Sequence, residues 1–278
     1  MLITFIGGGN MASALISGLA NPPRSDLQIR VVDPDQAARE RLQATFDLAA
    51  FTEPLAAVRG ADVVLLAVKP QIMPAVLEEL SGHVQPGQLV LSIAAGVTME
   101  SIESRLGEGL AVVRCMPNTP ALIGHGITGM TAGRHCNADQ RALAEEILSA
   151  ASEVVWLEDE DLMDAVTAIS GTVPAYYFLL TEVLAEAARE LGLPGPTADR
   201  LAAITSFGAG AMIASSPDEA EELRRRVTSP GGTTEAAMAV LESGSFRPLM
   251  RQAIRAARDR SRELSGPTAN PDEVASDG

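Results

Sequence analysis

The feature that most limits how this chain can fold is its first dozen residues. A short apolar run, Leu2–Ile6, leads straight into Gly7-Gly8-Gly9-Asn10-Met11-Ala12, after which apolar residues recur at helical spacing. Strand, glycine-rich turn and helix in that order match the G-x-G-x-x-G/A fingerprint of dinucleotide-binding folds. Gly7 would form the tight turn, and Gly9 would let backbone N–H groups approach a pyrophosphate at the positive end of the helix. The residues expected to bind a dinucleotide here are Ile6, Gly7, Gly9, Asn10 and Met11.

The alternation of strand and helix continues through the first 157 residues and predicts a mostly parallel sheet covered by helices on both faces. The predicted strands are Leu2–Ile6, Ile29–Asp33, Val63–Val68, Leu89–Ile93 and Ala111–Cys115, followed by Ile127–Thr131 and Val154–Leu157. The last two flank a predicted helix and are expected to complete the sheet, where an antiparallel strand would be unremarkable. We therefore predict an α/β Rossmann-type domain over residues 1–158.

After Trp156 the strand signals stop and the pattern becomes helical. The predicted helices are Asp159–Ile169, Val173–Leu191, Thr197–Ser215, Asp218–Arg226, Thr234–Glu242 and Phe246–Leu264. Ser216-Pro217-Asp218-Glu219 supplies an N-cap, a first-turn proline and a glutamate, so we expect a helix to begin there. The apolar stripe of the last helix suits either a core or a subunit interface. We predict an all-α domain over residues 159–266 and a disordered acidic tail over residues 267–278.

Composition argues against several classes of partner. The net charge of -15 opposes binding to nucleic acid or to an anionic membrane surface. Taking the run around Asp62, Ala61–Val68, as the longest apolar run, we expect no segment long enough to span a bilayer, and Met1–Ile6 lacks a basic leader segment. The two cysteines and three histidines have no metal-ligand spacing, and Cys115 is expected to be a packing residue rather than a nucleophile. We expect a cytoplasmic protein with no metal, nucleic-acid or membrane partner.

Asp33 ends the second predicted strand, where a carboxylate can accept hydrogen bonds from both hydroxyls of an adenosine ribose. The same charge would repel a 2′-phosphate, which favours NADH over NADPH. Arg30, Arg39 and Arg41 lie nearby in sequence, and one of them could turn to a phosphate. Use of either cofactor therefore remains open.

Three later strand ends carry residues suited to the same crevice. Ala67-Val68-Lys69-Pro70 contains the only lysine of the chain, which is either a cofactor contact or a solvated turn residue. Ala94 and Ala95 are small enough to let a nicotinamide ring lie close to the backbone. Asn118 lies between two prolines in a loop expected to be rigid, and we predict that it too contacts the cofactor.

In the predicted helical domain, two segments break the helical pattern with hydroxyl, glycine and proline residues. They are Ser170-Gly171-Thr172-Val173-Pro174 and Ser229-Pro230-Gly231-Gly232-Thr233-Thr234. The second presents several backbone N–H groups beside two hydroxyls, an arrangement suited to binding a carboxylate. The alternative is an ordinary loop with a threonine N-cap.

Together, the glycine-rich turn, Ala67-Val68-Lys69-Pro70, Ser92-Ile93-Ala94-Ala95-Gly96, Met116-Pro117-Asn118-Thr119-Pro120 and Ser229–Thr234 resemble those of the pyrroline-5-carboxylate reductases. The resemblance covers residues 2 to about 264. It implies reduction of 1-pyrroline-5-carboxylate to L-proline with NADPH or NADH, the last step of proline biosynthesis. It also implies a helical dimerisation domain and a homodimer.

 Dimers of the family often assemble into a pentamer of dimers, and we expect the same of this chain.

For the substrate that the resemblance implies, Thr234 and Thr172 are the expected catalytic residues: one or the other would hydrogen-bond the substrate nitrogen and help to deliver its proton, directly or through water. The expected substrate-binding residues are Ser170, Gly171, Ser229, Pro230, Gly231, Gly232 and Thr233. The chain departs from the family at one point: Thr172-Val173 stands where the family usually has a serine followed by glycine. Val173 adds a β-branched side chain beside the expected pocket, which places the substrate fit in question.

Two other functions share some of these sequence features. The β-hydroxyacid dehydrogenases also join a Rossmann domain to a helical domain, but their catalytic lysine lies in the helical part, and residues 159–278 of this chain contain no lysine. A dinucleotide-sensing module without turnover is the second alternative. The hydroxyls of Thr172, Thr233 and Thr234 argue against it, and an activity assay discriminates the two.

Overall fold

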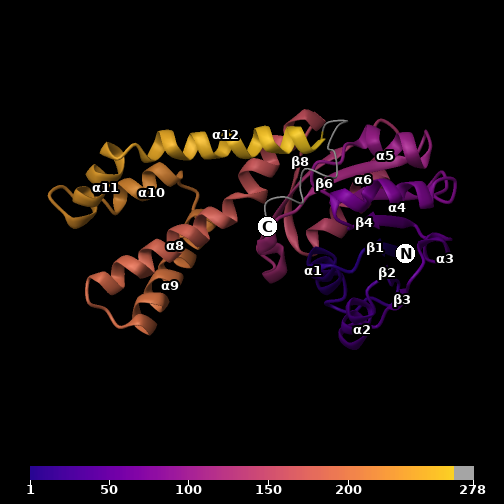
Figure 1. Ribbon diagram of the computed structural model, residues 1–278, viewed down its shortest axis with the longest axis horizontal. Helices are drawn as coiled ribbons and strands as arrows, with labels where there is room; N and C mark the ends of the chain where they lie inside the picture. Colours follow the sequence, from indigo (N-terminus) through magenta and orange to yellow (C-terminus); the bar gives the residue numbers. More distant parts are fainter. Residues whose placement is uncertain (266–278) are drawn as a thin grey trace. The chain divides into compact units, whose positions relative to one another are not determined.

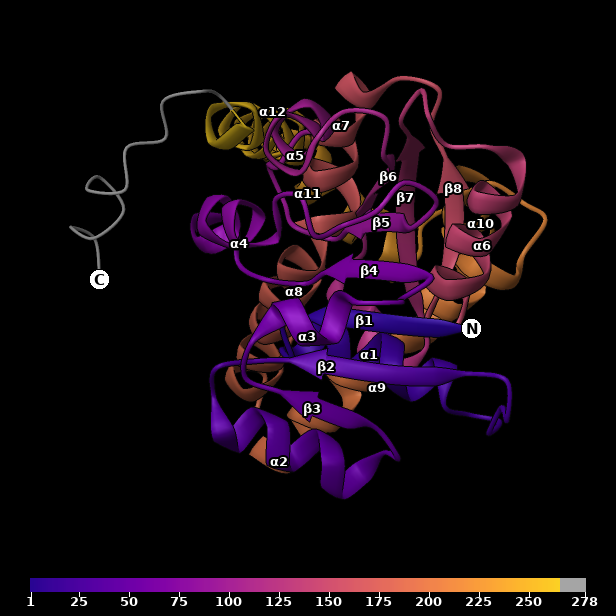
Figure 2. The same cartoon turned by 90° about the vertical axis from the view of Figure 1, so that its right-hand side faces the viewer.

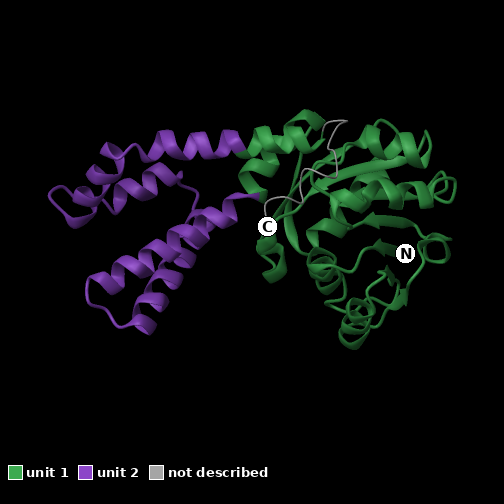
Figure 3. Ribbon diagram, viewed as in Figure 1, with its two compact units in different colours: residues 1–171, 257–278 green, residues 172–256 purple. Residues whose placement is uncertain are grey.

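A computed structural model describes residues 1–265 as two compact units (Figure 3). The first unit contains Met1–Gly171 together with the described residues from Ala257 onward, and the second contains Thr172–Ala256. The domain limits at residues 158 and 266 stay predictions. The predicted acidic tail, residues 267–278, lies outside the described residues.

The first unit is built on an eight-stranded sheet with the order β3-β2-β1-β4-β5-β6-β7-β8 (Figures 1 and 2). Its strands are β1 (Leu2–Ile6), β2 (Gln28–Val32), β3 (Ala49–Phe51), β4 (Val63–Leu66), β5 (Leu89–Ser92), β6 (Ala111–Met116), β7 (Gly126–Ala132) and β8 (Ser152–Trp156). Strands β1 to β6 are parallel, β7 is antiparallel to β6, and β8 is parallel to β7. The sequence did not predict β3, because three residues are too few to show a strand period.

Helices cover both faces of this sheet, as the alternation of strands and helices predicts. One buried cluster joins the sheet to α1 (Asn10–Leu19), α2 (Gln36–Thr45) and α6 (Ala138–Ser149). The other joins it to α3 (Pro54–Val58), α4 (Met73–Leu80) and α5 (Met99–Leu106). The remaining short elements are η1 (Pro70–Ile72), η2 (Thr119–Ile123), η3 (Glu160–Leu162), α7 (Met163–Val166) and a π-helical turn, η4 (Thr167–Gly171).

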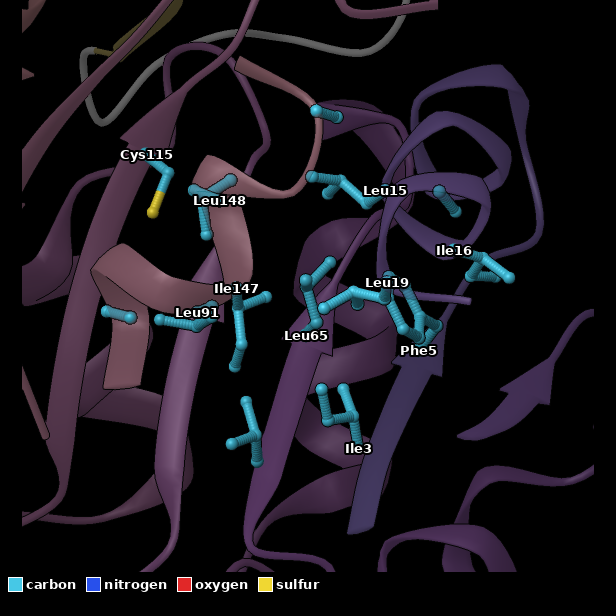
Figure 4. Close-up of a cluster of buried hydrophobic side chains, with 14 of the residues drawn as sticks. Ile3, Phe5, Leu15, Ile16, Leu19, Leu65, Leu91, Cys115, Ile147 and Leu148 are labelled. Atoms are coloured by element: carbon cyan, nitrogen blue, oxygen red, sulfur yellow. The ribbon is translucent and has the colours of Figure 1, made fainter. Parts of the chain in front are cut away.

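Strand β1 illustrates why the sheet needs both layers. Ile3 and Phe5 are fully buried on the face covered by α1, where Leu15 and Ile16 meet them (Figure 4). Thr4 points to the opposite face, and its hydroxyl donates to the Ala57 carbonyl at 2.8 Å. Each fully buried aliphatic or aromatic side chain contributes about 1.5–3 kcal/mol. A strand apolar on both faces is therefore stable only between two helical layers.

The second unit is entirely helical within its described residues. It contains α8 (Val173–Glu190), α9 (Gly195–Ser215), α10 (Ala220–Arg226), α11 (Thr233–Ser243) and the first half of α12 (Phe246–Ser265). Helices α8 and α9 lie side by side (Figure 1), joined by a hydrogen bond between the Thr181 and Ser206 hydroxyls and by the Arg189–Asp199 ion pair. Their large apolar side chains are nevertheless exposed, including Phe178 at 67% on α8.

The predicted helix start at Asp218 is wrong by two residues, since α10 begins at Ala220. The Ser216 hydroxyl accepts a hydrogen bond from the Asp218 N–H at 3.0 Å, which closes a local turn instead of capping the helix. Serine and aspartate favour turns and N-caps by the same kind of hydrogen bond, so the sequence pattern does not separate the two.

Candidate functional site

Gly7 occupies a backbone position that only glycine can take. Its φ of 105° lies in the left-handed half of conformational space, and a Cβ there would stand 2.6 Å from the Ala67 carbonyl oxygen. The Gly7 N–H donates to the Val32 carbonyl at 2.8 Å. The turn after β1 is thus packed against the ends of β2 and β4, as expected for the first glycine of the fingerprint.

Gly9 differs from Gly7, because its φ of -71° is an ordinary value and the space around it is open. It is the N-cap of α1, no side chain caps the helix, and no described atom lies within 4 Å of where its Cβ would be. Gly9 and Asn10 are both exposed. Uncapped N–H groups at the positive end of a helix, approached over a glycine, fit a phosphate group. The fit for a dinucleotide therefore rests on the geometry of this turn.

Asp33 and Arg41 bind the two backbone polar groups of Gly8. The Asp33 carboxylate accepts from the Gly8 N–H at 2.7 Å and from the Asp35 N–H at 2.9 Å. The Arg41 guanidinium donates to the Gly8 carbonyl at 3.2 Å. Gly8 itself is tightly enclosed, because a Cβ would stand 2.9 Å from Leu42. The expected ribose-binding carboxylate is therefore also a structural partner of the glycine-rich turn.

The other two candidate arginines have different surroundings. Arg39 donates to the carbonyls of Asp33 and Pro34, so it lies at the same end of β2. Arg30 donates to the carbonyls of Ala57 and Arg59, so it binds the C-terminal end of α3. Arg39 and Arg41 border the expected ribose site, whereas Arg30 does not.

The segment after β4 lies against the glycine-rich turn. The Ala67 N–H donates to the Ile6 carbonyl at 2.8 Å, and Ala67 and Val68 are half-buried. Lys69 is exposed at the start of η1, and Pro70 is the first residue of that turn. The backbone thus brings Ala67–Pro70 to the same edge as Gly7, while a cofactor contact for Lys69 stays a prediction.

The ends of β5 and β6 carry the remaining expected cofactor residues. Ala94 is buried and Ala95 half-buried directly after β5. Asn118 is buried after β6, and its side-chain oxygen accepts from the Ile127 N–H at 3.0 Å. That oxygen fixes the start of β7, so Asn118 has a structural role that the sequence did not predict.

Ser170 and Gly171 lie in the π-helical turn η4, at the carboxyl end of β6. A Cβ on Gly171 would stand 2.7 Å from the Met116 Cε atom, so a larger residue here would require the methionine side chain to move. The Ser170 hydroxyl donates to the Val166 carbonyl at 3.0 Å. Single π-turns are frequent at functional sites, and here one replaces the helix break that the sequence indicated.

In the second unit, the Ser229–Thr234 segment already binds a carboxylate. The Gly231 N–H donates to the Glu235 carboxylate at 2.8 Å, and Gly231 has a φ of 71°. Glu235 was missed by sequence reasoning, although an acid four residues beyond a glycine turn was a usable signal. The backbone here therefore donates a hydrogen bond to a carboxylate, which is also the charged group of the expected substrate.

The two expected catalytic threonines differ in their settings. Thr234 is half-buried in the first turn of α11, whose N-cap is Gly232. The alternative that Thr234 is the N-cap is therefore wrong. Thr172 is half-buried at the N-cap position of α8, directly before Val173 and Pro174.

Cys115 is fully enclosed among apolar residues of the first unit (Figure 4). Burial raises the pKa of its thiol far above the usual range. The reactive thiolate is therefore suppressed, in agreement with a packing role. Among residues 1–265, no group of three His, Cys, Asp or Glu side chains is arranged to hold a metal ion.

Comparison with known proteins gives matches in both parts of the chain. Residues 160–264 match the family model described as pyrroline-5-carboxylate reductase dimerisation, and residues 2–96 match the model described as NADP oxidoreductase coenzyme F420-dependent. A pyrroline-5-carboxylate reductase from Pseudomonas aeruginosa is 47% identical, over 95% of this chain and 96% of the relative.

Two solved structures extend the comparison. A pyrroline-5-carboxylate reductase from Coxiella burnetii is 41% identical with a TM-score of 0.88, covering 95% of this chain and 98% of its own. A pyrroline carboxylate reductase from Plasmodium falciparum, solved with NADP bound, is 28% identical with a TM-score of 0.83, covering 96% and 98%. The similarity thus spans both units.

Proposed function

This chain belongs to the pyrroline-5-carboxylate reductase family and is an NAD(P)H-dependent oxidoreductase of proline biosynthesis. We propose that its turn at Gly7–Gly9 holds the cofactor and its turn at Gly231–Gly232 holds the substrate. The reaction is the reduction of 1-pyrroline-5-carboxylate to L-proline. The observation that supports the site assignment best is the Gly231 N–H, which binds the Glu235 carboxylate. A loop that binds one carboxylate can bind that of the substrate.

The cofactor-binding residues proposed are those at the carboxyl edge of the sheet. Gly9 and the first turn of α1 would hold the pyrophosphate, and Asp33 the adenosine ribose. Ala67–Pro70, Ala94, Ala95 and Asn118 would border the nicotinamide half. The nicotinamide cofactor supplies the hydride when it is bound.

The residues proposed to act on the substrate are few, because a protonated cyclic imine already accepts hydride readily. The N–H groups of Gly231 to Thr234 would anchor the carboxylate, and Ser229, Pro230, Ser170 and Gly171 would shape the pocket. The hydroxyl of Thr234 or Thr172 would hydrogen-bond the nitrogen and keep its proton in place. The main contribution of the chain is then orientation of the two reactants.

Either reduced cofactor is compatible with the site. Asp33 favours NADH by charge, whereas Arg39 and Arg41 lie near enough to offset the charge of a 2′-phosphate. The Plasmodium relative binds NADP. We propose that this chain uses both, with the preference set by the balance between Asp33 and the two arginines.

We also propose a homodimer that assembles into a pentamer of dimers, located in the cytoplasm. By length and composition alone, the Glu160–Glu190 stretch could cross a membrane, and little of it is buried in one chain. That stretch falls inside the dimerisation match at residues 160–264. A second copy of the chain therefore accounts for its exposed apolar side chains better than lipid does, and neither lipid nor nucleic acid is proposed as a partner.

The test is an assay of the purified protein with 1-pyrroline-5-carboxylate and either reduced cofactor. Loss of the nicotinamide absorbance together with formation of proline is the expected result. Cofactor binding without turnover would support the sensing module instead. Failure with both cofactors would refute the proposed reaction.

A further inference from the structure

The two chain segments that connect to the second unit both end in polar contacts inside the first unit. One is the segment from Glu160 to Gly171, and the other is the end of α12 from Ala257 to Ser265. The contacts of Glu160, Asp164, Ser261 and Leu264 in these segments are not used by the reaction proposed above. The contacts converge on the loop that follows β5.

Glu160 provides the first contact. Its Oε1 atom accepts from the Arg114 guanidinium at 2.8 Å and from the Met99 N–H at 2.9 Å. Arg114 lies on β6 with only 4% of its surface exposed, so the Glu160 carboxylate is needed to compensate its buried positive charge. Met99 is the first residue of α5, whose N-cap is Thr98. One carboxylate therefore ties η3 to β6 and to the start of α5.

Asp164 and Ser261 provide the second contact. The Ser261 hydroxyl donates to the Asp164 carboxylate at 2.6 Å, and Ser261 is 5% exposed. Arg262 lies 3.7 Å from the same carboxylate but is largely exposed. A polar cavity of about 280 Å³ borders these groups, with Thr98, Arg114 and Asp164 in its lining. Hydrogen bonds, more than close packing, therefore fix the end of α12 here.

Leu264 carries that attachment to the loop. It lies one helical turn beyond Ser261, on the same face of α12. Gly96 has a φ of 72°, and a Cβ on it would stand 3.4 Å from the Leu264 Cβ. The loop after β5 is thus contacted at Gly96 by α12, and Glu160 holds Met99, the first residue after the loop. Gly96 directly follows Ala94 and Ala95.

We propose that Glu160, Asp164, Ser261 and Leu264 form a latch that positions the Ile93–Thr98 loop for the nicotinamide half of the cofactor. The inference rests on the proposed function, because it takes this loop as a cofactor contact. A loop that these contacts already fix needs no further ordering when the cofactor binds. A loop without them loses conformational entropy on binding, which lowers the affinity for the cofactor. The four residues touch no reacting atom, so they are positioning residues.

The test compares three variants of the full chain. Ser261→Ala removes the hydrogen bond to Asp164, and Asp164→Asn keeps an oxygen that can accept it. Glu263→Gln is the matched control on the same turn of α12, where Glu263 forms an exposed ion pair with Arg260. The readouts are the Kd for NADH by fluorescence titration, the KM values for both substrates, and the melting temperature.

Ser261→Ala is expected to raise the Kd and KM for NADH about five-fold, with the KM for pyrroline-5-carboxylate within about two-fold of wild type. Asp164→Asn and Glu263→Gln are expected to stay within about two-fold on every readout. Leu264→Gly removes the Cβ atom that faces Gly96 and should reproduce the effect of Ser261→Ala without disturbing any side-chain hydrogen bond. It serves as the test if Ser261→Ala does not fold.

An unchanged Kd for NADH in both Ser261→Ala and Leu264→Gly, with only the melting temperature lowered, would overturn the latch. The binding readout does not require turnover. If wild type binds NADH but forms no proline, the proposed function fails while the latch is still tested by the Kd values.

Discussion

The Asp33 carboxylate accepts a hydrogen bond from the Gly8 N–H at 2.7 Å, so the residue expected to read the ribose also holds the glycine-rich turn. Arg41 donates to the carbonyl of the same residue, so both backbone polar groups of Gly8 are bound. Substitutions at Asp33 therefore change two properties together: the charge near the ribose and the rigidity of the turn. The first prediction separates them.

Asp33→Ser should shift the kcat/KM ratio toward NADPH by roughly ten-fold, because the charge that repels a 2′-phosphate is lost. It should also raise the KM for NADH, since serine is too short to reach Gly8 in the same way. Asp33→Asn keeps an acceptor for the Gly8 N–H and should shift the ratio with a smaller rise in KM. An unchanged ratio in both variants would mean that another residue reads the ribose.

Thr234→Ala should lower kcat by about 10² or more, because the hydroxyl proposed to contact the substrate nitrogen is lost. The KM should rise only modestly, since the backbone N–H groups remain. The melting temperature should hold, because the N-cap of α11 is Gly232. Ser243→Ala, on the same helix, is the control. A wild-type kcat in Thr234→Ala would contradict this role, and Thr172 would then be the candidate for the hydroxyl that contacts the substrate nitrogen.

Glu235→Gln should lower the KM for pyrroline-5-carboxylate about three-fold. In the structure, Glu235 occupies the Gly231 N–H that the substrate carboxylate would use, and its charge would repel that carboxylate. Steady-state kinetics at saturating NADH measure the change. A KM that rises instead would show that Glu235 supports the loop and does not compete with the substrate.

Phe178→Glu should weaken or abolish the oligomer, because it places a charge in the exposed apolar face of α8. Light scattering at micromolar concentration reports the mass of the assembly, and activity should fall along with it. Glu79→Gln, on α4 of the first unit, is the surface control. A fully active wild-type monomer would contradict the proposed assembly.

Thiol labelling should follow the raised pKa values of both cysteines. Burial raises the pKa of Cys115 and of Cys136, so both thiols stay protonated at neutral pH and react slowly. A raised pKa makes the folded state bind the proton more tightly than the unfolded chain. The resulting stabilisation is present below the unfolded pKa of about 8.5 and declines as pH rises above it. Rapid labelling of Cys115 in the native protein at pH 7 would contradict its burial.

Much of the cofactor half was predictable because its signals are local. The turn at Gly7 and Gly9 follows from the backbone requirements of a strand that passes into a helix, and those requirements act within a few residues. The alternation of strands and helices similarly gave the α/β class before any contact was known. The departure of Thr172-Val173 from the family pattern was also visible in the letters alone, and its effect on the pocket stays a prediction.

What the tertiary structure decided are the pairings between distant residues. Three hydrogen bonds show this: Asp33 with Gly8, Asn118 with Ile127, and Glu160 with Arg114. Each joins two different elements, and no repeating pattern in the sequence indicates that the two residues will meet. The same holds for Ser261 with Asp164, which lie 97 residues apart. Sequence patterns report which face of a strand or helix is apolar, because that is a property of neighbouring residues. Which carboxylate meets which donor depends on how the elements pack, and only the folded chain fixes it.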